Sequence, residues 1–290
     1  MSRIPETDLI LNADGSVYHL NLLPEDIGGT VITVGDPDRV AEVSKYFDDI
    51  ELKKSKREFV SHTGTIGNKR LTALSTGIGT DNIDIVLNEL DALVNIDLKT
   101  RLPKSDLRSL DIIRIGTSGA VQADIPVDSM LVSTAAFGMD TLMHYYKQNI
   151  SPEREKLLAD FKLVLPAGHQ FSPYITQADK PLLNKLAQGL QQGITISAPG
   201  FYAPQGRQVR ARLAITGLID AIQGFNSSGQ RITNLEMETA GIYGMAAALG
   251  HRALSFNVIL ANRVTQHFSK QPQQIMDACI KQVLELVVSD

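Results

Sequence analysis

The chain has 290 residues, of which 43% are hydrophobic and 21% charged, and this composition predicts a globular protein with a large buried core. Its formal net charge of −4 lacks the basic surplus that nucleic-acid binding needs, so nucleic acid is not an expected partner. The single cysteine, Cys279, excludes an internal disulfide and a multi-cysteine metal site. The N-terminus has no apolar signal segment and no apolar run is long enough to span a bilayer, so we expect a cytoplasmic protein without membrane contact.

Short β-branched runs alternate with longer amphipathic stretches, which predicts an α/β fold. In chain order, the expected strands are Thr30–Val34, Phe59–Ile66, Leu71–Thr76, Ile112–Gly116, Ser129–Ala135, Ile194–Ala198 and Arg252–Leu260. The expected helices are Arg39–Phe47, Ile83–Val94, Ala178–Gln191, Thr216–Phe225, Met237–Leu249 and Gln273–Val288.

The connection between the second and third expected strands decides the type of sheet. It consists of Gly67 and Asn68, a hairpin-like turn that implies an antiparallel pair. We therefore expect a mixed, twisted central sheet flanked by helices. No repeat or flexible linker interrupts the sequence, so residues 1–290 are expected to form a single domain.

Three glycine-containing loops are expected at strand ends, where α/β proteins usually bind ligands. They are Gly35–Arg39, Ser75–Gly79 and Arg114–Ala120. The second loop lacks the third glycine of a dinucleotide fingerprint, and no P-loop is present. Glycine lets backbone amides approach an anion and arginine binds phosphate oxygens in pairs. Arg39, Arg114 and the Thr117 hydroxyl together favour a phosphate site, although either loop alone is better explained as a tight turn or as the start of a surface helix.

Two later segments carry further polar groups. In Asn234–Gly241, Glu236 and Glu238 stand where a strand runs into a helix, and their carboxylates either favour the helix dipole or accept hydrogen bonds from a ribose diol. Spacing alone does not choose between these roles. Phe201–Arg207 offers aromatic faces for a planar ring, an amide and a cation, or else it forms a proline–glycine surface loop.

Taken together, these blocks resemble the nucleoside phosphorylase superfamily, which includes uridine phosphorylase and the hexameric purine nucleoside phosphorylases. The resemblance extends from His19 to Arg263. It rests on the motifs GDPDR at 35–39, REF at 57–59, STGIG at 75–79, RIGTSGA at 114–120 and EMETAGIYGMA at 236–246. It implies a nucleoside-cleaving pentosyltransferase of nucleoside salvage and catabolism, with inorganic phosphate as co-substrate and no other cofactor.

The resemblance also implies a role for each matched residue. Phosphate would be bound by Gly35, Arg39, Arg57, Arg114 and Thr117. Ribose would be bound by His19, Thr117, Met237 and Glu238. The base would be bound by Phe201, Gln205, Arg207 and Arg263. Arg39, Arg57, Arg114 and Glu238 would carry the catalysis. Both Arg57 and His19 would enter the site of the neighbouring subunit, where His19 would approach the 5′-hydroxyl of the nucleoside.

The base pocket distinguishes the members of this superfamily. Purine-specific hexameric relatives place an aspartate after the late strand, whereas here Phe256–Leu260 leads into Ala261–Thr265 without an acidic residue. Gln205, Arg207 and Arg263 resemble uridine phosphorylase, so uridine is the expected substrate. The alternatives are a purine nucleoside phosphorylase, a nucleosidase that uses water, and a nucleoside-binding protein without catalytic activity.

The resemblance further implies a homo-oligomer built from dimers, expected to be a hexamer. A monovalent cation at the dimer interface would be held by Glu58, Ile78 and Asn82, although a serine is usual at the last position. The stretches Asp97–Leu110 and Phe137–Ser172 look longer than in compact relatives, and the sequence assigns them no role.

Overall fold

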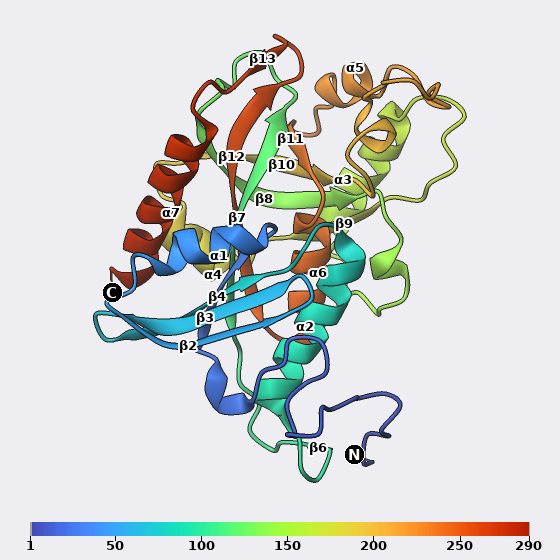
Figure 1. Cartoon of the computed structure of the whole chain (residues 1–290). Helices are drawn as coiled ribbons and strands as arrows, with labels where there is room; N and C mark the ends of the chain where they lie inside the picture. The colour runs from blue at the N-terminus through green and yellow to red at the C-terminus, as the bar shows by residue number, and fades with distance from the viewer. Residues whose placement is uncertain (1, 290) are drawn as a thin grey trace.

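The computed structural model describes residues 2–289, so the expected domain of residues 1–290 includes two terminal residues outside the described part. A mixed sheet of 11 strands runs through the molecule, with helices packed on both of its sides (Figure 1). Its strands are β1 (Thr30–Val34), β2 (Asp49–Lys56), β3 (Phe59–Ile66), β4 (Lys69–Ser75), β7 (Asp111–Ala120), β8 (Met130–Gly138), β9 (Tyr174–Gln177), β10 (Gln191–Ser197), β11 (Ile232–Glu236), β12 (Arg252–Asn262) and β13 (His267–Phe268). This confirms the predicted α/β class and the mixed sheet.

β7 joins the two parts of the sheet and pairs with three other strands. It lies parallel to β1 and β12 and antiparallel to the end of β11. Since β12 also pairs with β8, and β8 joins β11 through β10, these five strands close into a ring. β1, β4, β3 and β2 extend the sheet away from that ring, and β3 and β4 form the predicted antiparallel hairpin.

The helices are α1 (Pro37–Ser44), α2 (Thr80–Asn95), α3 (Pro152–Val164), α4 (Lys180–Leu186), α5 (Leu218–Gln223), α6 (Thr239–Leu249) and α7 (Pro272–Val288). α6 is buried along most of its length and packs against α2, β8, β9, β10 and β12. α7 is amphipathic and turns one apolar face toward α1, α4 and β12, on the side of the sheet where Figure 1 draws it in red. None of the described helices is both long and apolar enough to cross a membrane.

Several predicted boundaries are wrong. Arg114–Ala120, expected as a loop, belongs to β7, because its residues pair with β12 along their whole length. The helix expected over Ala178–Gln191 is reduced to α4, because Asp179 caps its start and Gln191 already opens β10. The helix expected from Met237 begins two residues later, with Glu238 at the N-cap.

Several elements, among them β2, β9, β11 and α3, were absent from the predicted set or only partly present in it. β2, with its sequence DIELKKSK, is a polar strand at the edge of the sheet, so it lacks the apolar run that reveals a buried strand. β9 and β11 are short, and only the polar end of β11 was expected. α3 lies inside the stretch Phe137–Ser172 and begins where the Ser151 side chain accepts a hydrogen bond from the Arg154 N–H.

Candidate active site

A cavity of about 750 Å³ lies where the ends of β1 and β4 meet the outer half of β7 and the end of β11. β11 runs antiparallel to β7, and its residues Asn234 and Leu235 pair with Ala120 and Gly119 at the end of that strand. The lining includes twelve of the residues to which the resemblance gives a role. They are Gly35, Arg39, Glu58, Ile78, Asn82, Arg114, Thr117, Phe201, Gln205, Arg207, Met237 and Glu238. His19, Arg57 and Arg263 do not line it.

On one side of the cavity two arginine side chains, Arg39 and Arg114, lie close enough to repel each other. Asp36 caps α1 by accepting a hydrogen bond of 3.0 Å from the Asp38 N–H, and this turn places Arg39 in the first part of the helix, at the cavity wall. Burial lowers the pKa of Arg39, and the nearby positive charge of Arg114 lowers it further, against the opposing effect of Asp36. An anion bound between the two guanidinium groups would relieve this repulsion.

Arg114 is buried and bonded to two carboxylates. Its Nη2 lies 2.7 Å from Glu238 Oε2 and 2.9 Å from Glu236 Oε2, while Nη1 donates to Asn257 Oδ1 at 3.0 Å. Burial alone would lower the pKa of Arg114, but the two carboxylates outweigh it and the pKa is raised. Gly116 makes room for this geometry, since a Cβ at that position would overlap the guanidinium. The positive charge of Arg114 is thereby fixed in place.

Glu236 organises the turn into α6. Its carboxylate accepts hydrogen bonds from the Ser197 hydroxyl at 2.5 Å and from the backbone N–H groups of Glu238 and Thr239 at 2.9 and 3.0 Å. Spacing in the sequence left the role of Glu236 open between the helix dipole and a ribose diol, and the structure shows its carboxylate on the N–H groups at the helix start. The signal was the pair of glutamates at the junction of a strand and a helix, where free N–H groups need acceptors.

Glu238 is held between two segments. One carboxylate oxygen bonds Arg114 and the other accepts a hydrogen bond of 2.9 Å from the Gly79 N–H. Burial raises the pKa of Glu238, and the carboxylate of Glu236 adds to this, whereas Arg114 and the Gly79 N–H counteract it. The carboxylate therefore has fixed partners on one side and faces the cavity on the other.

The opposite wall is formed by residues 201–207. Arg207 Nη1 donates to the Phe201 carbonyl at 2.7 Å and to Gln205 Oε1 at 2.6 Å, and its guanidinium lies 3.9 Å from the centre of the Phe201 ring. Burial lowers the pKa of Arg207 to about 10, and the charge of Arg263 contributes. An amide, a cation and an aromatic ring thus lie together, as a polar planar ring requires.

Arg263 lies behind this wall instead of in it. Its Nη1 donates to the Gln205 carbonyl at 2.8 Å, which fixes the backbone that carries the Gln205 side chain. The structure thus places Arg263 where it supports the loop, and its expected direct contact with the base stays a prediction.

Arg57 and His19 lie together outside the cavity of their own chain. Arg57 occupies the turn between β2 and β3 in the left-handed region, with φ of 56°, a conformation that costs energy for a residue other than glycine. Its guanidinium lies 5.8 Å from the centre of the Tyr18 ring, and the His19 ring lies 4.9 Å from the same ring. The two residues expected to enter a neighbouring site therefore share one region of the surface.

The residues of the expected cation site also lie close together. Asn82 and the Glu58 side chain both pack against Gly77, next to Ile78. Carboxylate, amide and backbone carbonyl oxygens are donors that suit a hard cation, so the residue types present are compatible with the expected monovalent ion, whose binding stays a prediction. Among the described residues, no cluster of three or more histidine, cysteine or acidic side chains could hold a metal ion.

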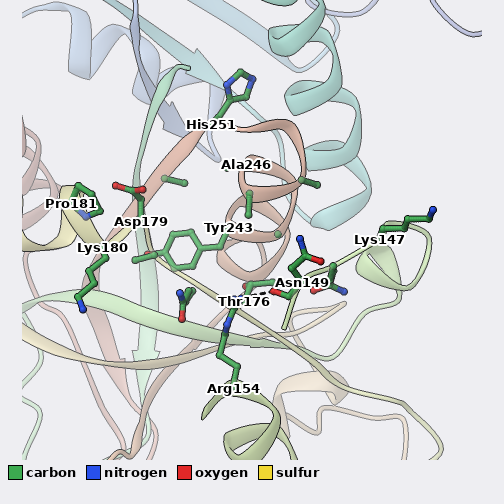
Figure 2. A pocket seen from close by; sticks show the side chains of 17 residues that line it. Lys147, Asn149, Arg154, Thr176, Asp179, Lys180, Pro181, Tyr243, Ala246 and His251 are labelled. Carbon is green, nitrogen blue, oxygen red and sulfur yellow. Dashed lines mark hydrogen bonds between the residues drawn. The ribbon is translucent and has the colours of Figure 1, made fainter. Parts of the chain in front are cut away.

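A second cavity, of about 460 Å³, lies on another side of α6 (Figure 2). Lys147, Arg154 and Lys180 line it together with a run of small residues of α6. The hydroxyl of Tyr243, another lining residue, donates a hydrogen bond to the Ser133 carbonyl and accepts one from the Ser255 N–H. None of the residues predicted for the site lines this cavity, so the candidate active site is the cavity beside β7.

The fold and the cavity define an α/β protein with a buried ion pair of Arg114 and Glu238 at the wall of a polar cavity, and comparisons with known proteins identify its family. The family model of the Phosphorylase superfamily matches residues 30–289, and the chain belongs to this superfamily. It is 29% identical over 282 residues to the uridine phosphorylase of Haemophilus influenzae, covering 94% of each chain. It is 28% identical over 257 residues to that of Thermococcus kodakarensis, covering 89% of this chain and 81% of the relative.

A solved structure extends the comparison to three dimensions. The chain superposes with a TM-score of 0.89 on a nucleoside phosphorylase of Trypanosoma brucei whose crystal structure is described as showing uridine phosphorylase activity. The two sequences are 29% identical, and the match covers 98% of this chain and 100% of the other.

Proposed function

We propose that this chain catalyses the reversible phosphorolysis of uridine to uracil and ribose 1-phosphate. The observation that carries the proposal is the bond between Arg114 and Glu238, because it makes the anion subsite continuous with the subsite for sugar hydroxyls. Gln205 and Arg207 stand in the same cavity and supply groups for a pyrimidine. The similarity to uridine phosphorylases of two organisms supports this choice of substrate.

The reaction needs charge to be stabilised at both ends of the glycosidic bond. As the bond from C1′ to N1 breaks, its electron pair leaves on uracil and the sugar becomes positive, while a phosphate oxygen bonds to C1′. Arg39 and Arg114, with Arg57 of the neighbouring subunit, would bind and orient the phosphate. Gly35 and Thr117 would add donors.

The sugar and the base would be held by separate groups. Glu238 would accept hydrogen bonds from the ribose hydroxyls beside Met237, so that displacement starts from an aligned geometry. Negative charge on uracil spreads over O2 and O4, where Gln205 and Arg207 can stabilise it, and Phe201 would stack on the ring. No dedicated general acid is then needed.

The competing functions fit the structure less well. A purine enzyme of this superfamily would need an acidic group after β12, but Asn262 stands there and its amide donates to the Gln122 and Ile125 carbonyls, both at 2.8 Å. A nucleosidase would have no use for several arginines directed at phosphate. A protein that only binds nucleosides would not need the buried pair of Arg114 and Glu238.

The assembly and the remaining components are part of the proposal. We propose a cytoplasmic homo-oligomer built from dimers, expected as a hexamer, in which Arg57 and His19 complete the neighbour's site. Glu58, Ile78 and Asn82 would hold a monovalent cation near that interface. The partners are small molecules, and neither nucleic acid nor a membrane is involved.

One activity screen tests the function. Uridine, thymidine, inosine and adenosine are each incubated with the enzyme in the presence and absence of phosphate. We expect cleavage of uridine only with phosphate. A preference for inosine or adenosine would overturn the choice of base, and cleavage that does not depend on phosphate would overturn the reaction.

A further inference from the structure

A single carboxylate, that of Glu89 on α2, holds the segment that carries His19. It accepts hydrogen bonds from the His19 N–H at 2.9 Å and from the Leu20 N–H at 2.8 Å, and His19 Nδ1 lies 2.6 Å from Oε1. Glu89 is only 8% exposed. A buried carboxylate needs such donors, and here all three come from two consecutive residues.

This contact determines the position of the proton on the His19 ring. Backbone N–H groups only donate, so the oxygens of Glu89 act as acceptors, and Nδ1 must carry a hydrogen to bond with them. In the neutral ring, Nε2 is then the free acceptor. An acidic side chain that selects a histidine tautomer in this way is a known device for preparing the other ring nitrogen for chemistry or binding.

The ring is also confined on its sides. The Tyr18 ring meets it edge to face at 4.9 Å, and the Phe59 ring lies at 6.4 Å with an interplanar angle of 80°. The His19 side chain keeps 25% of its surface exposed. It is therefore held in orientation while one part of it remains accessible.

The helix that provides Glu89 is tied to the active site at its other end. Gly79, the N-cap of α2, donates its N–H to Glu238. Ten residues later the same helix anchors His19, a separation of about 15 Å along a straight helix. One rigid helix, α2, thus holds two groups: the Glu238 carboxylate, which is expected to bind ribose in its own site, and His19, which is expected in the neighbour's site.

We propose that Glu89 is a positioning residue for the reaction, which selects the Nδ1–H tautomer of His19 and directs Nε2 to accept a hydrogen bond from the nucleoside 5′-hydroxyl in the neighbouring subunit's site. This inference rests on the proposed function. It goes beyond a purely structural role, in which Glu89 would only anchor the chain between residues 17 and 20.

The test compares uridine with 5′-deoxyuridine, which lacks the hydroxyl that His19 would recognise. In Glu89→Gln, an amide replaces one acceptor by a donor, so the ring loses its fixed tautomer. We expect kcat/KM for uridine to fall about 3- to 10-fold, the usual range for one uncharged hydrogen bond, with kcat/KM for 5′-deoxyuridine nearly unchanged. His19→Ala should show the same selective loss, and the double variant should lose no more than either single variant.

Asp91→Asn is the matched control, because Asp91 is an acidic residue of the same helix that contacts His251 instead of His19, at 3.3 Å. Asp91→Asn should leave the ratio of kcat/KM for uridine to kcat/KM for 5′-deoxyuridine unaltered. Equal losses with both substrates in Glu89→Gln would overturn the proposal and leave Glu89 a structural role.

The tautomer is measured separately, by nitrogen-15 NMR of the histidine rings in the unmodified protein. We expect Nδ1 of His19 to carry the proton and Nε2 to be free, and the opposite tautomer would overturn the proposal even if no variant folds. This readout needs no activity. Failure of uridine phosphorolysis in the unmodified enzyme would instead overturn the proposed function, so the two failures are distinguishable.

Discussion

Arg114 and Glu238, 124 residues apart in the sequence, are bonded at 2.7 Å in the interior of the protein. The first is expected to bind phosphate and the second the ribose hydroxyls, so the two substrates would bind to opposite ends of one ion pair. Because each charge compensates the other away from water, replacing either leaves a buried charge without its partner. Binding and stability are therefore coupled at this pair, and the coupling can be measured.

Arg39→Ala and Arg114→Ala should both weaken the use of phosphate, by roughly 10- to 100-fold for each lost charge-assisted bond. They should differ in stability. Arg114→Ala leaves Glu236 and Glu238 unpaired and should cost about 3–5 kcal/mol, whereas Arg39 has no such buried partner and its loss should cost much less. Phosphate saturation curves and urea unfolding separate the two effects. Unchanged phosphate dependence in both variants would refute the phosphate site.

Gly116→Ala should impair phosphate use although it adds only one methyl group. The new Cβ would overlap the Arg114 guanidinium, whose bonds to Glu236, Glu238 and Asn257 oppose its displacement, and such overpacking typically costs 1–3 kcal/mol. Gly119→Ala is the control in the same strand, because its Cβ would meet Arg263 Cγ at an ordinary 3.5 Å. Equal phosphate kinetics in the two variants would show that the position of Arg114 does not depend on Gly116.

Gln205→Ala should lower kcat/KM for uridine strongly. Expressed as a free energy, this loss should exceed the decrease in the free energy of unfolding. The Gln205 side chain bonds only Arg207 within the described structure, so its loss removes the amide from the base subsite while the backbone stays held by Arg263. Gln208→Ala, whose exposed side chain accepts a weak hydrogen bond from the Leu213 N–H, should leave activity near that of the unmodified enzyme. Steady-state kinetics with thermal unfolding distinguish the effects. A larger loss of stability than of activity would contradict the assignment.

Mixing two inactive variants should restore activity if the site is shared between chains. In a dimer of Arg57→Ala with Glu238→Gln, one site contains both substitutions and the other contains neither. Random exchange makes about half of the dimers mixed, so roughly a quarter of the full activity should return. Mass spectrometry confirms that mixed oligomers form. If they form without recovered activity, Arg57 acts in its own chain or not at all.

Cys279 should resist thiol reagents in the folded protein. Burial raises its pKa to about 12, with Arg39 acting weakly in the opposite direction, so at pH 8 only about one molecule in ten thousand carries the reactive thiolate. Since the unfolded chain loses this proton first, at its ordinary value near 9.0, the group should also reduce stability as the pH rises from about 9 toward 12. Labelling at pH 8 with and without denaturant checks the first point. Rapid labelling of the folded protein would contradict it.

Local patterns determined much of the fold before any contact was known. The strand Phe59–Ile66 was predicted with its observed bounds, and β1 likewise, because β-branched residues between turn residues are a property of the chain itself. The blocks around Arg39, Arg114 and Glu238 were recognisable from residue type and order, since glycine, arginine and glutamate restrict the chemistry that a strand end can perform. β2 was not predicted, because an edge strand can be polar and its sequence DIELKKSK has no apolar run.

Tertiary structure alone decided how these residues meet. The residues from 114 to 120 read as a loop, but pairing with β12 makes them strand, and only that register brings Arg114 under Gly116 and against Glu238. Likewise, no spacing in the sequence links Glu89 to His19, 70 residues away, or moves Arg263 behind the wall that it was expected to form. Sequence patterns report the local preferences of the chain. A hydrogen bond between distant residues depends on the packing of the whole sheet, because an error of one residue in register turns a side chain to the opposite face.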